Sequence, residues 1–380
     1  TAALAELARD ASHRHALLGT AAAVAALELR RKGNPFGVFD GRIEDAEIRE
    51  LLAREFSADR HTFSPSQLET YLACPFQFYS RHVLHLTPIS EADELDEDFT
   101  DRGSRLHDIL EEFEKRRAES DGSIPDDRLL TAAVDKVLAK EIQDLSELAL
   151  GLREIEHGQI ERIIAQYALQ RAEYASQSPA EPSPTWFEFG VGAPGTEHPV
   201  FELDLGEEVV KLKGWIDRID VVPTPSGSRF RVIDYKSGSP PSAKDVTEGR
   251  MLQLPLYAMA VEQLLYQNGE TALMDVGYWG LKDKGYRPIV FERWREVREE
   301  LKGRVLQIIR RIREGEFHIA PRKDGCETYC EYRGVCRIRQ VRTADKASAA
   351  EAKAEASAEK TLAGRPSKGA RAARTRTGRS

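Results

Sequence analysis

The chain has 380 residues, of which 41% are hydrophobic and 31% are charged. This length is enough for one large domain or two ordinary ones, with a buried apolar core. No stretch approaches the roughly 18 consecutive apolar residues of a membrane span, and charged residues interrupt the Ala-rich start, which excludes a signal peptide. We therefore expect a soluble, cytoplasmic protein.

The net charge of −8 is unevenly distributed along the chain. Residues 341–380 contain ten Lys and Arg against four Asp and Glu, so this tail is basic and the remainder is acidic. An acidic body does not indicate nucleic-acid binding through overall charge. Any contact with DNA is expected from a local groove or from the tail.

The first segment, residues 1–32, is rich in Ala and Leu and predicts a helix that ends at the Gly-Asn-Pro sequence at 33–35. The sequence begins at Thr1, without Met and directly within this helix. We therefore expect the chain to be a piece of a longer protein, with residues 1–60 as a helical segment that ends a preceding domain.

A sharper helix start follows at Ser64, where Pro65 and Gln67 complete the pattern of a capping box. Pro75 is expected to end this helix, which places Cys74 at a helix end. The seven acidic residues within 91–101 predict a solvated loop.

Three further helices are predicted after this loop. The first carries an apolar stripe over residues 106–113 with His107 at its edge, and the other two span about 127–148 and 152–176.

A Pro-rich break then separates these helices from a region with two-residue periodicity. This alternation predicts strands at 186–191, 200–205, 209–222 and 230–236, with a turn at 223–228. A helix at 247–267, strands at 275–279 and 288–291, and a helix at 294–314 follow. The pattern predicts an α/β fold in which helices flank a small mixed sheet.

Two acidic residues and a lysine lie on the strands of the predicted hairpin. Asp234 and Lys236 are two residues apart and share an otherwise apolar strand face, and Asp217 lies on the neighbouring strand. Burying such charges is costly unless they pair or bind a metal. Two carboxylates and a lysine fit metal-assisted hydrolysis, in which the carboxylates hold a hard divalent cation that lowers the pKa of a bound water. Lys236 would orient this water or stabilise charge on a phosphate.

A purely structural ion pair is the alternative for this pattern, between Asp234 and either Lys236 or Arg218. Asp220 is a secondary candidate for a metal ligand, because its spacing from Asp217 places it on the opposite strand face.

Five short motifs follow one another along the chain. They are S-P-S-Q-L-E-x-Y-x-x-C-P at 64–75, G-x-x-x-H at 103–107, G-x-x-D at 214–217, D-Y-K-S-G at 234–238 and Q-L-P-L-Y at 253–257. In this order they resemble the PD-(D/E)XK nucleases of the RecB/AddB type, over roughly residues 62–337. The resemblance implies a restriction-endonuclease-like core at 61–340.

The same resemblance implies roles for six residues. These are the metal ligands His107, Asp217 and Asp234, the catalytic Lys236, and the supporting residues Gln253 and Tyr257. Gln253 and Tyr257 are four residues apart and share a helical face. Because imidazole suits Mn²⁺ better than Mg²⁺, either cation is a candidate for the working metal.

Four cysteines are too few for a disulfide scaffold, and Cys326, Cys330 and Cys336 are closely spaced. With the distant Cys74, the resemblance implies an iron-sulfur staple in which four thiolates hold a [4Fe-4S] cluster. The first spacing, Cys-x3-Cys, is one residue longer than is usual in the family. A four-cysteine zinc site and unligated thiols therefore remain alternatives.

The resemblance implies a metal-dependent deoxyribonuclease, an exonuclease on single strands that a helicase delivers in double-strand break repair and recombination. The sequence contains no G-x-x-x-x-G-K-[S/T] phosphate loop, so we expect the ATP-driven motor in an upstream helicase-like domain or in a partner subunit. The tail at 341–380 is expected to be disordered.

Two alternatives for the function belong to other classes. One is a catalytically inactive, cluster-stabilised clamp or scaffold that binds DNA in a helicase-nuclease complex. The other is a zinc-stapled interaction domain.

Overall fold

The structure is a computed structural model of the 380-residue chain. It describes residues 20–21, 24, 40–88, 99–120, 122–139, 147–176, 183–193, 195–196, 198–224, 227–266, 271–282, 285–323, 325–336 and 338. Of the predicted segments, the tail at 341–380, most of the helix at 1–32 and most of the acidic loop lie outside the described residues. Thr20, Ala21 and Val24 are helical.

The chain divides into two compact units. The larger unit comprises residues 45–73 and 77–315, and the smaller unit comprises residues 1–44, 74–76 and 316–380. All strands that the structure describes belong to the larger unit, whereas the four cysteines belong to the smaller one. The domain limits at residues 60 and 340 stay predictions.

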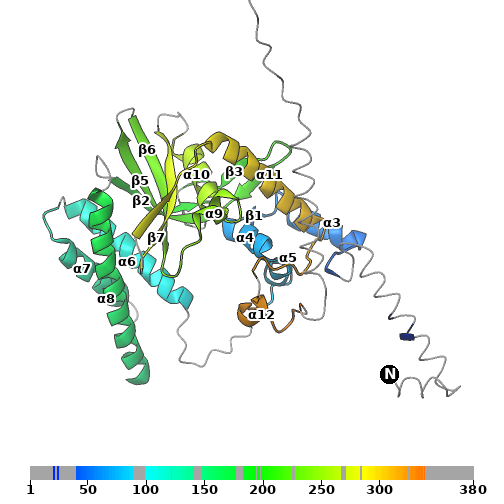
Figure 1. The fold of residues 1–380 in the computed structure, drawn as a ribbon, viewed down its shortest axis with the longest axis horizontal. Coiled ribbons are helices and arrows are strands. Elements are labelled where there is room, and N and C mark those ends of the chain that lie inside the picture. The colour runs from blue at the N-terminus through cyan, green and yellow to red at the C-terminus, as the bar shows by residue number, and fades with distance from the viewer. Residues whose placement is uncertain are drawn as a thin grey trace, which may run out of the picture. The chain divides into compact units, whose positions relative to one another are not determined.

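A five-stranded mixed sheet with the order β2-β5-β6-β7-β8 forms the centre of the larger unit (Figure 1). Its strands are β2 (Ser183–Val191), β5 (Gly214–Thr224), β6 (Gly227–Lys236), β7 (Thr271–Gly280) and β8 (Gly285–Ile289). β6 and β7 are parallel, and the other neighbours are antiparallel. The connection between the parallel strands contains two helices, as parallel pairing requires a long crossover.

A smaller three-stranded sheet has the order β1-β4-β3. Its strands are β1 (Thr62–Phe63), β3 (Phe201–Asp204) and β4 (Val209–Leu212). β1 is parallel to β4, and β3 is antiparallel to β4.

The described helices are α3 (Ala46–Glu55), α4 (Pro65–Ala73), α5 (Pro75–Phe78), α6 (Phe99–Ser120), α7 (Asp126–Leu138), α8 (Glu147–Ser176), α9 (Ala243–Thr247), α10 (Gln253–Leu264), α11 (Trp294–Arg313) and α12 (Cys326–Tyr329). Tyr79–Val83 form a π-helical segment. The sheets and helices confirm the predicted α/β class.

Helices cover both faces of the five-stranded sheet (Figure 1). On one face, apolar residues of α6, α7 and α8 pack against Ile233, Tyr235 and Trp279 in a buried core. Since side chains alternate along a strand, Asp234 faces the other side, where Gln253 at the start of α10 donates a hydrogen bond to it. The two faces of this sheet therefore differ: one packs in an apolar core, and the other carries the hydrogen bond between Gln253 and Asp234.

The capping box is confirmed at the start of α4. The Gln67 N–H donates to Ser64 Oγ at 3.2 Å, and the Ser64 N–H donates to Gln67 Oε1 at 3.1 Å. The helix ends at Ala73, directly before Cys74, as Pro75 predicts.

One predicted strand and three predicted helices show the largest differences from the structure. The strand expected at 209–222 is two strands, because the Lys213 N–H donates to Phe63 O and the chain passes there from the small sheet to the large one. The helix expected at 247–267 is replaced by α9 and α10, because the N–H groups of Arg250 and Met251 fold back onto Asp245 O. The helix expected at 127–148 is observed as α7, Asp126–Leu138, and the helix expected at 152–176 is observed as α8, Glu147–Ser176.

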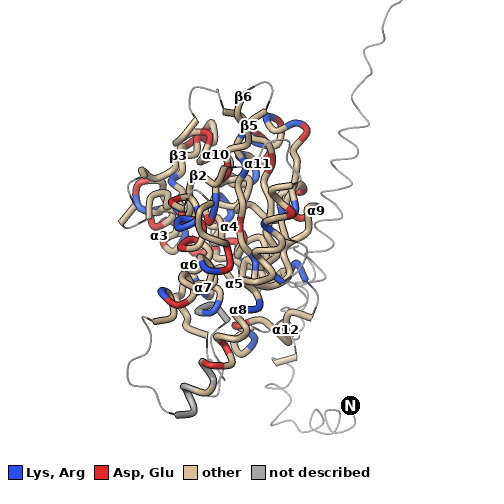
Figure 2. Tube along the Cα trace, turned by 90° about the vertical axis from the view of Figure 1, so that its left-hand side faces the viewer, with Lys and Arg blue, Asp and Glu red and all other residues tan. Residues whose placement is uncertain are grey.

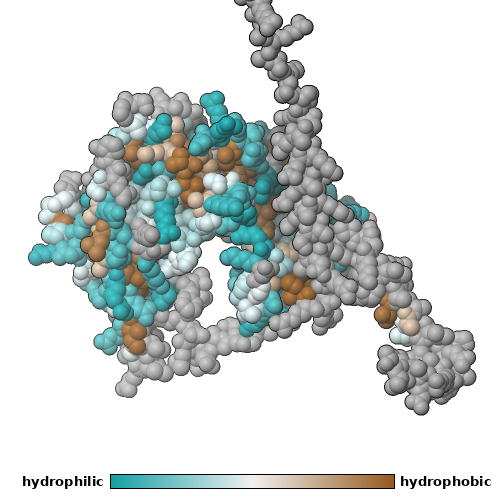
Figure 3. All heavy atoms as spheres, viewed as in Figure 1, coloured by the Kyte–Doolittle hydropathy of each residue, from teal (hydrophilic) through white to brown (hydrophobic). Residues whose placement is uncertain are grey.

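In the part of the chain that the structure describes, no helix has the length and apolar character to cross a membrane. The face drawn in Figure 3 is largely hydrophilic, with its apolar residues in small separate patches. Basic and acidic residues are interspersed along the described trace (Figure 2).

Candidate metal and catalytic site

The candidate site lies in the larger unit, where β5 and β6 separate. The last paired residues of the two strands are Arg218 and Ile233. Beyond this pair, the Tyr235 N–H donates to Asp217 Oδ2 at 2.6 Å. The Asp217 carboxylate therefore satisfies a backbone donor of β6 and lies beside Asp234, whose pKa it raises.

Helix α6 brings His107 to the same place. His107 Nδ1 lies 3.4 Å from Asp217 Oδ1 and 3.7 Å from Glu188 Oε1. One ligand atom from each of the three residues lies within 4.8 Å of the other two. An imidazole and two carboxylates form a donor set for a divalent cation.

Glu188 was not predicted from the sequence. It lies on β2 between the pairs Phe187–Arg218 and Phe189–Ile216, which places it across the ladder from Asp217. Its φ of 43° falls in the left-handed region, which is unfavourable for a residue other than glycine. The available sequence signal is an acidic residue within an apolar and aromatic strand, but its proximity to Asp217 depends on the register.

The electrostatics of this group show an excess of buried negative charge. Burial alone would lower the pKa of His107, but hydrogen bonds and charges from Asp217 and Glu188 raise it to about 10. Burial raises the pKa of Glu188, and the Asp217 charge adds to this effect. Burial and Asp217 together raise the pKa of Asp234 to about 7, although Lys236 acts in the opposite direction. A cation would relieve this repulsion.

Asp234 is held between two partners. Lys236 Nζ forms an ion pair with Asp234 Oδ2, and Gln253 Nε2 donates to Asp234 Oδ1 at 2.8 Å. The Lys236 ammonium also lies 5.6 Å from the centre of the Tyr278 ring. The ion pair that the sequence offered as a structural alternative is thus present, and it lies next to the candidate metal ligands.

Glu69 positions this arrangement through the start of α10. Its Oε1 accepts the N–H groups of Leu252 and Gln253 at 2.6 and 2.8 Å. A carboxylate at a helix N-terminus satisfies unpaired donors and interacts favourably with the helix dipole. Glu69, within the first sequence motif, therefore fixes the helix turn that carries Gln253.

Tyr257 lies one turn further along α10, close to β5. The backbone N–H of Trp215 donates to the Tyr257 phenol oxygen. Burial together with the charges of Asp234 and Asp217 raises the pKa of Tyr257. A Cβ on Gly214 would lie 2.5 Å from the phenol oxygen, so the close approach requires glycine there. The six predicted site residues are thus gathered in the larger unit: His107, Asp217, Asp234, Lys236, Gln253 and Tyr257.

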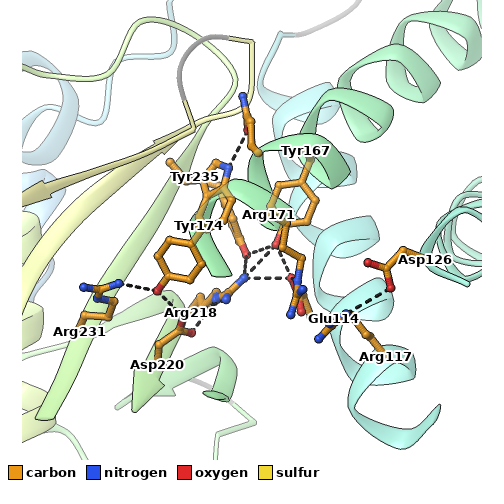
Figure 4. A network of polar contacts seen from close by, with 12 residues as sticks. Glu114, Arg117, Asp126, Tyr167, Arg171, Tyr174, Arg218, Asp220, Arg231 and Tyr235 are labelled. Carbon is orange, nitrogen blue, oxygen red and sulfur yellow. Dashed lines mark hydrogen bonds and ion pairs between the residues drawn. The ribbon is translucent and has the colours of Figure 1, made fainter. Parts of the chain in front are cut away.

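A buried polar network lies beside the site, between β5 and the helices α6 and α8 (Figure 4). Arg218, which is fully buried, donates to both carboxylate oxygens of Asp220 at 2.6 and 2.9 Å and to Glu114 at 3.0 Å. Arg171 and Tyr167 also donate to Glu114. Asp220, the secondary candidate for a metal ligand, therefore belongs to this network, and Arg218 does not pair with Asp234.

The four cysteines lie in the smaller unit. Burial raises the pKa of Cys336 to about 11, and the charges of Cys74, Cys326 and Cys330 act in the same direction. The thiols are therefore near enough to interact. Among the described residues, however, the group of three ligand atoms within 4.8 Å comprises His107, Glu188 and Asp217 and includes no cysteine.

Comparison with known families gives a match over residues 62–337, to the model described as the PD-(D/E)XK nuclease superfamily. Three similar proteins are named as a subunit of an ATP-dependent helicase/deoxyribonuclease. That of Acetivibrio thermocellus is 32% identical over 228 residues, which cover 54% of this chain and 18% of the relative. That of Desulforudis audaxviator is 34% identical over 220 residues, which cover 55% of this chain and 18% of the relative.

The third, from Thermoanaerobacter sp. strain X514, is 28% identical over 278 residues, covering 70% of this chain and 23% of the relative. The chain thus spans about a fifth of the length of these relatives.

Proposed function

Because the chain belongs to the PD-(D/E)XK nuclease superfamily, we propose that it is a metal-dependent deoxyribonuclease that hydrolyses phosphodiester bonds. The observation that carries this proposal is the grouping of His107, Glu188 and Asp217 beside the Asp234–Lys236 pair. A fold alone does not determine function, whereas this set of side chains has a definite chemistry.

The donor set fits a divalent cation. His107, Asp217 and Glu188 would hold it, with Asp234 as the fourth ligand, and the buried acids would lose their mutual repulsion. The imidazole favours Mn²⁺ within this set, although carboxylates also suit Mg²⁺. Such a cation supplies Lewis acidity, which neutralises charge on a phosphate and favours ionisation of the attacking water.

The remaining residues act on the substrate or on these ligands. The Lys236 ammonium would donate to a phosphate oxygen as negative charge develops on it. Its exposed fraction of 32% leaves the ammonium accessible from solvent although Asp234 holds it in place. Gln253 orients the Asp234 carboxylate, and Tyr257 supports the β5 backbone near Asp217.

The names of the relatives extend the proposal to substrate and partners. We propose that the chain acts as an exonuclease on DNA single strands that a helicase delivers during double-strand break repair and recombination. The helicase would be an upstream domain or a separate partner protein.

We also propose a structural [4Fe-4S] cluster on Cys74, Cys326, Cys330 and Cys336. All four cysteines are described and belong to the smaller unit, and the charges of Cys74, Cys326 and Cys330 act on the Cys336 thiol. Four thiols that interact in this way are a ligand set for an iron-sulfur cluster, and one zinc ion is the alternative for the same ligand set.

The test is digestion of end-labelled single- and double-stranded DNA with Mg²⁺ or Mn²⁺. We expect the parent to cut, Asp234→Ala to be inactive, and Lys236→Ala to lose about 100-fold or more. Lys244→Ala, at an exposed lysine, is the matched control. DNA affinity, measured in Ca²⁺, should be retained by Lys236→Ala.

Two outcomes would contradict parts of this proposal. Unchanged cleavage by Lys236→Ala would remove this residue from the mechanism. If neither the parent nor Asp234→Ala cuts with any metal, but both bind DNA, the clamp function becomes the better account.

A further inference from the structure

Trp215 is a large aromatic residue exposed next to the candidate site. Its exposed fraction is 46%, whereas the next two residues of β5, Ile216 and Asp217, are buried. The other three tryptophans are all described, and none is among the exposed apolar residues. An indole that is exposed beside a candidate site offers an apolar face with a polar edge, which a bound ligand can contact.

The register places Trp215 close to the metal ligands. Gly190 and Trp215 are directly opposite in the β2–β5 ladder, and Glu188 and Asp217 lie two residues further along. Two residues of strand rise correspond to about 6.8 Å. This is comparable with the length of one nucleotide in an extended strand.

The face on which Trp215 lies follows from its neighbours. Gly214 faces Tyr257 on α10, and successive residues of a strand point to opposite sides. Trp215 therefore faces the side of the sheet on which α6 brings His107 to Asp217.

The indole is also supported from beneath. A Cβ at Gly190 would lie 2.9 Å from Trp215 Cζ3, so the six-membered ring rests against the backbone of β2, where a larger residue would displace it. The backbone N–H of Trp215 donates to the Tyr257 phenol oxygen, which fixes the main chain of β5 at this residue. A ring with one supported side and an exposed remainder is preorganised for stacking.

We propose that Trp215 stacks against a nucleobase of a DNA single strand, next to the phosphate bound at the candidate site. This inference rests on the proposed nuclease function and adds a substrate contact to it. Only an unstacked base offers its face to a side chain, so the contact favours single strands over duplexes. The chain outside the tail is acidic, so a contact that does not depend on charge gives affinity where phosphate attraction is weak.

The parent chain alone provides the first test. Oligothymidylates that carry one abasic site at successive positions are bound in Ca²⁺, which keeps binding separate from cleavage. We expect one position at which removal of the base weakens binding roughly 10-fold. Equal affinity at every position would overturn the proposal.

Variants then assign the effect to Trp215. Trp215→Ala should bind the intact oligonucleotide about 10-fold more weakly and lose its sensitivity to the abasic site, whereas Trp215→Phe should retain both. In cleavage assays the loss should fall mainly on KM. The ratio of the parent and Trp215→Ala affinities should change little with salt, unlike the loss of a phosphate contact. Val290→Ala, at an exposed residue after the opposite edge strand β8, is the control.

The two proposals fail in different ways. If the parent cuts DNA and Trp215→Ala, folded by circular dichroism, binds as the parent does, the stacking contact is wrong and the nuclease stands. If the parent neither binds nor cuts DNA with any metal, the proposed function itself is wrong, and the stacking contact falls with it.

Discussion

Glu188 has an unfavourable backbone conformation and also belongs to the charged group that it forms with His107 and Asp217. A left-handed φ in a residue other than glycine costs about 1–3 kcal/mol, and such conformations concentrate at functional sites. Here the strained residue directs its carboxylate toward His107 Nδ1 and lies across the ladder from Asp217. The position is therefore better explained by a role in ligand binding than by the stability of β2.

The first prediction concerns this carboxylate. Glu188→Gln keeps the size of the side chain but removes one charged oxygen donor, so Mn²⁺ affinity should fall about 10-fold or more, as for other changes around metal sites. Isothermal titration calorimetry measures the affinity. Glu202→Gln, at an exposed glutamate of β3, controls for the loss of one acidic charge. If both variants bind Mn²⁺ as the parent does, Glu188 is not a ligand.

His82 provides a second prediction, for stability against pH. Burial lowers its pKa to about 4, and the charges of Arg81, His61 and His85 act in the same direction. Because the folded state favours neutral His82, its contribution is fully present above the unfolded pKa of about 6.5 and is lost as the pH falls from 6.5 toward 4. Since the residue is only partly buried and solvent screens its charge, we expect the loss to be only ~1–2 kcal/mol.

The measurement is urea unfolding of the parent and His82→Gln between pH 4 and 7. The variant should lose less stability than the parent across this window. His157→Gln, at a histidine of α8 whose side chain is 40% exposed, controls for the removal of an imidazole. Parallel curves for the parent and His82→Gln would contradict the assignment.

At the scale of elements, the buried network of Figure 4 joins the pieces that carry the metal ligands. Helix α6 carries both His107 and Glu114, two turns apart on one helix face. Strand β5 carries Asp217 next to Arg218, which bridges Glu114 and Asp220. The network therefore fixes α6 against β5, and with it the distance between two candidate ligands.

The third prediction follows from the burial of this bridge. Arg218→Met leaves Glu114 and Asp220 without their shared cation, and removal of one partner of a buried ion pair typically costs about 3–5 kcal/mol. Urea unfolding should show this loss. Lys244→Ala, which breaks an exposed pair with Glu248, should cost less than ~1 kcal/mol. A cost for Arg218→Met as small as for the control would show that the network does not fix the two elements together.

The same scale explains how far the sequence predicted the structure. The start of α4 is predictable from Ser64, Pro65 and Gln67, because capping is a local interaction. Asp234 and Lys236 are predicted together because strand alternation is local as well. Glu188 and Glu69 escape prediction because their roles depend on register and on contact between distant helices.

The division of the expected strand at 209–222 has the same kind of cause. Apolar alternation continues across Lys213, but the partners change from the small sheet to the large one. Alternation of apolar and polar residues indicates which side chains are buried, but it does not identify the neighbouring strands with which the segment pairs.

At the scale of the whole chain, the smaller unit is assembled from segments that are distant in sequence. Cys74 and Cys326 are separated by nearly all of the larger unit, yet their charges interact. A group bound to all four thiols would close this long segment, and closing long loops restricts the unfolded state most. Its contribution would therefore be to stability, with no electron transfer in phosphodiester hydrolysis.

The fourth prediction tests this proposed cluster. Protein purified without oxygen should be brown and contain about four iron and four sulfide per chain. Bound metal also opposes the burial and the charge repulsion that raise the pKa of Cys336, because a coordinated thiol is deprotonated. Cys336→Ser should lose the colour and the iron and become sensitive to proteolysis in the smaller unit. Val335→Ser, at an exposed neighbouring residue, should retain all three properties.

The two units give this experiment an internal reference. The candidate ligands His107, Glu188 and Asp217 lie in the larger unit, so Cys336→Ser should retain Mn²⁺ binding even when the iron is lost. Joint loss of iron and Mn²⁺ binding would show that the larger unit depends on the cluster for its fold. A colourless parent with about one zinc per chain would contradict the iron-sulfur assignment and support the four-cysteine zinc site.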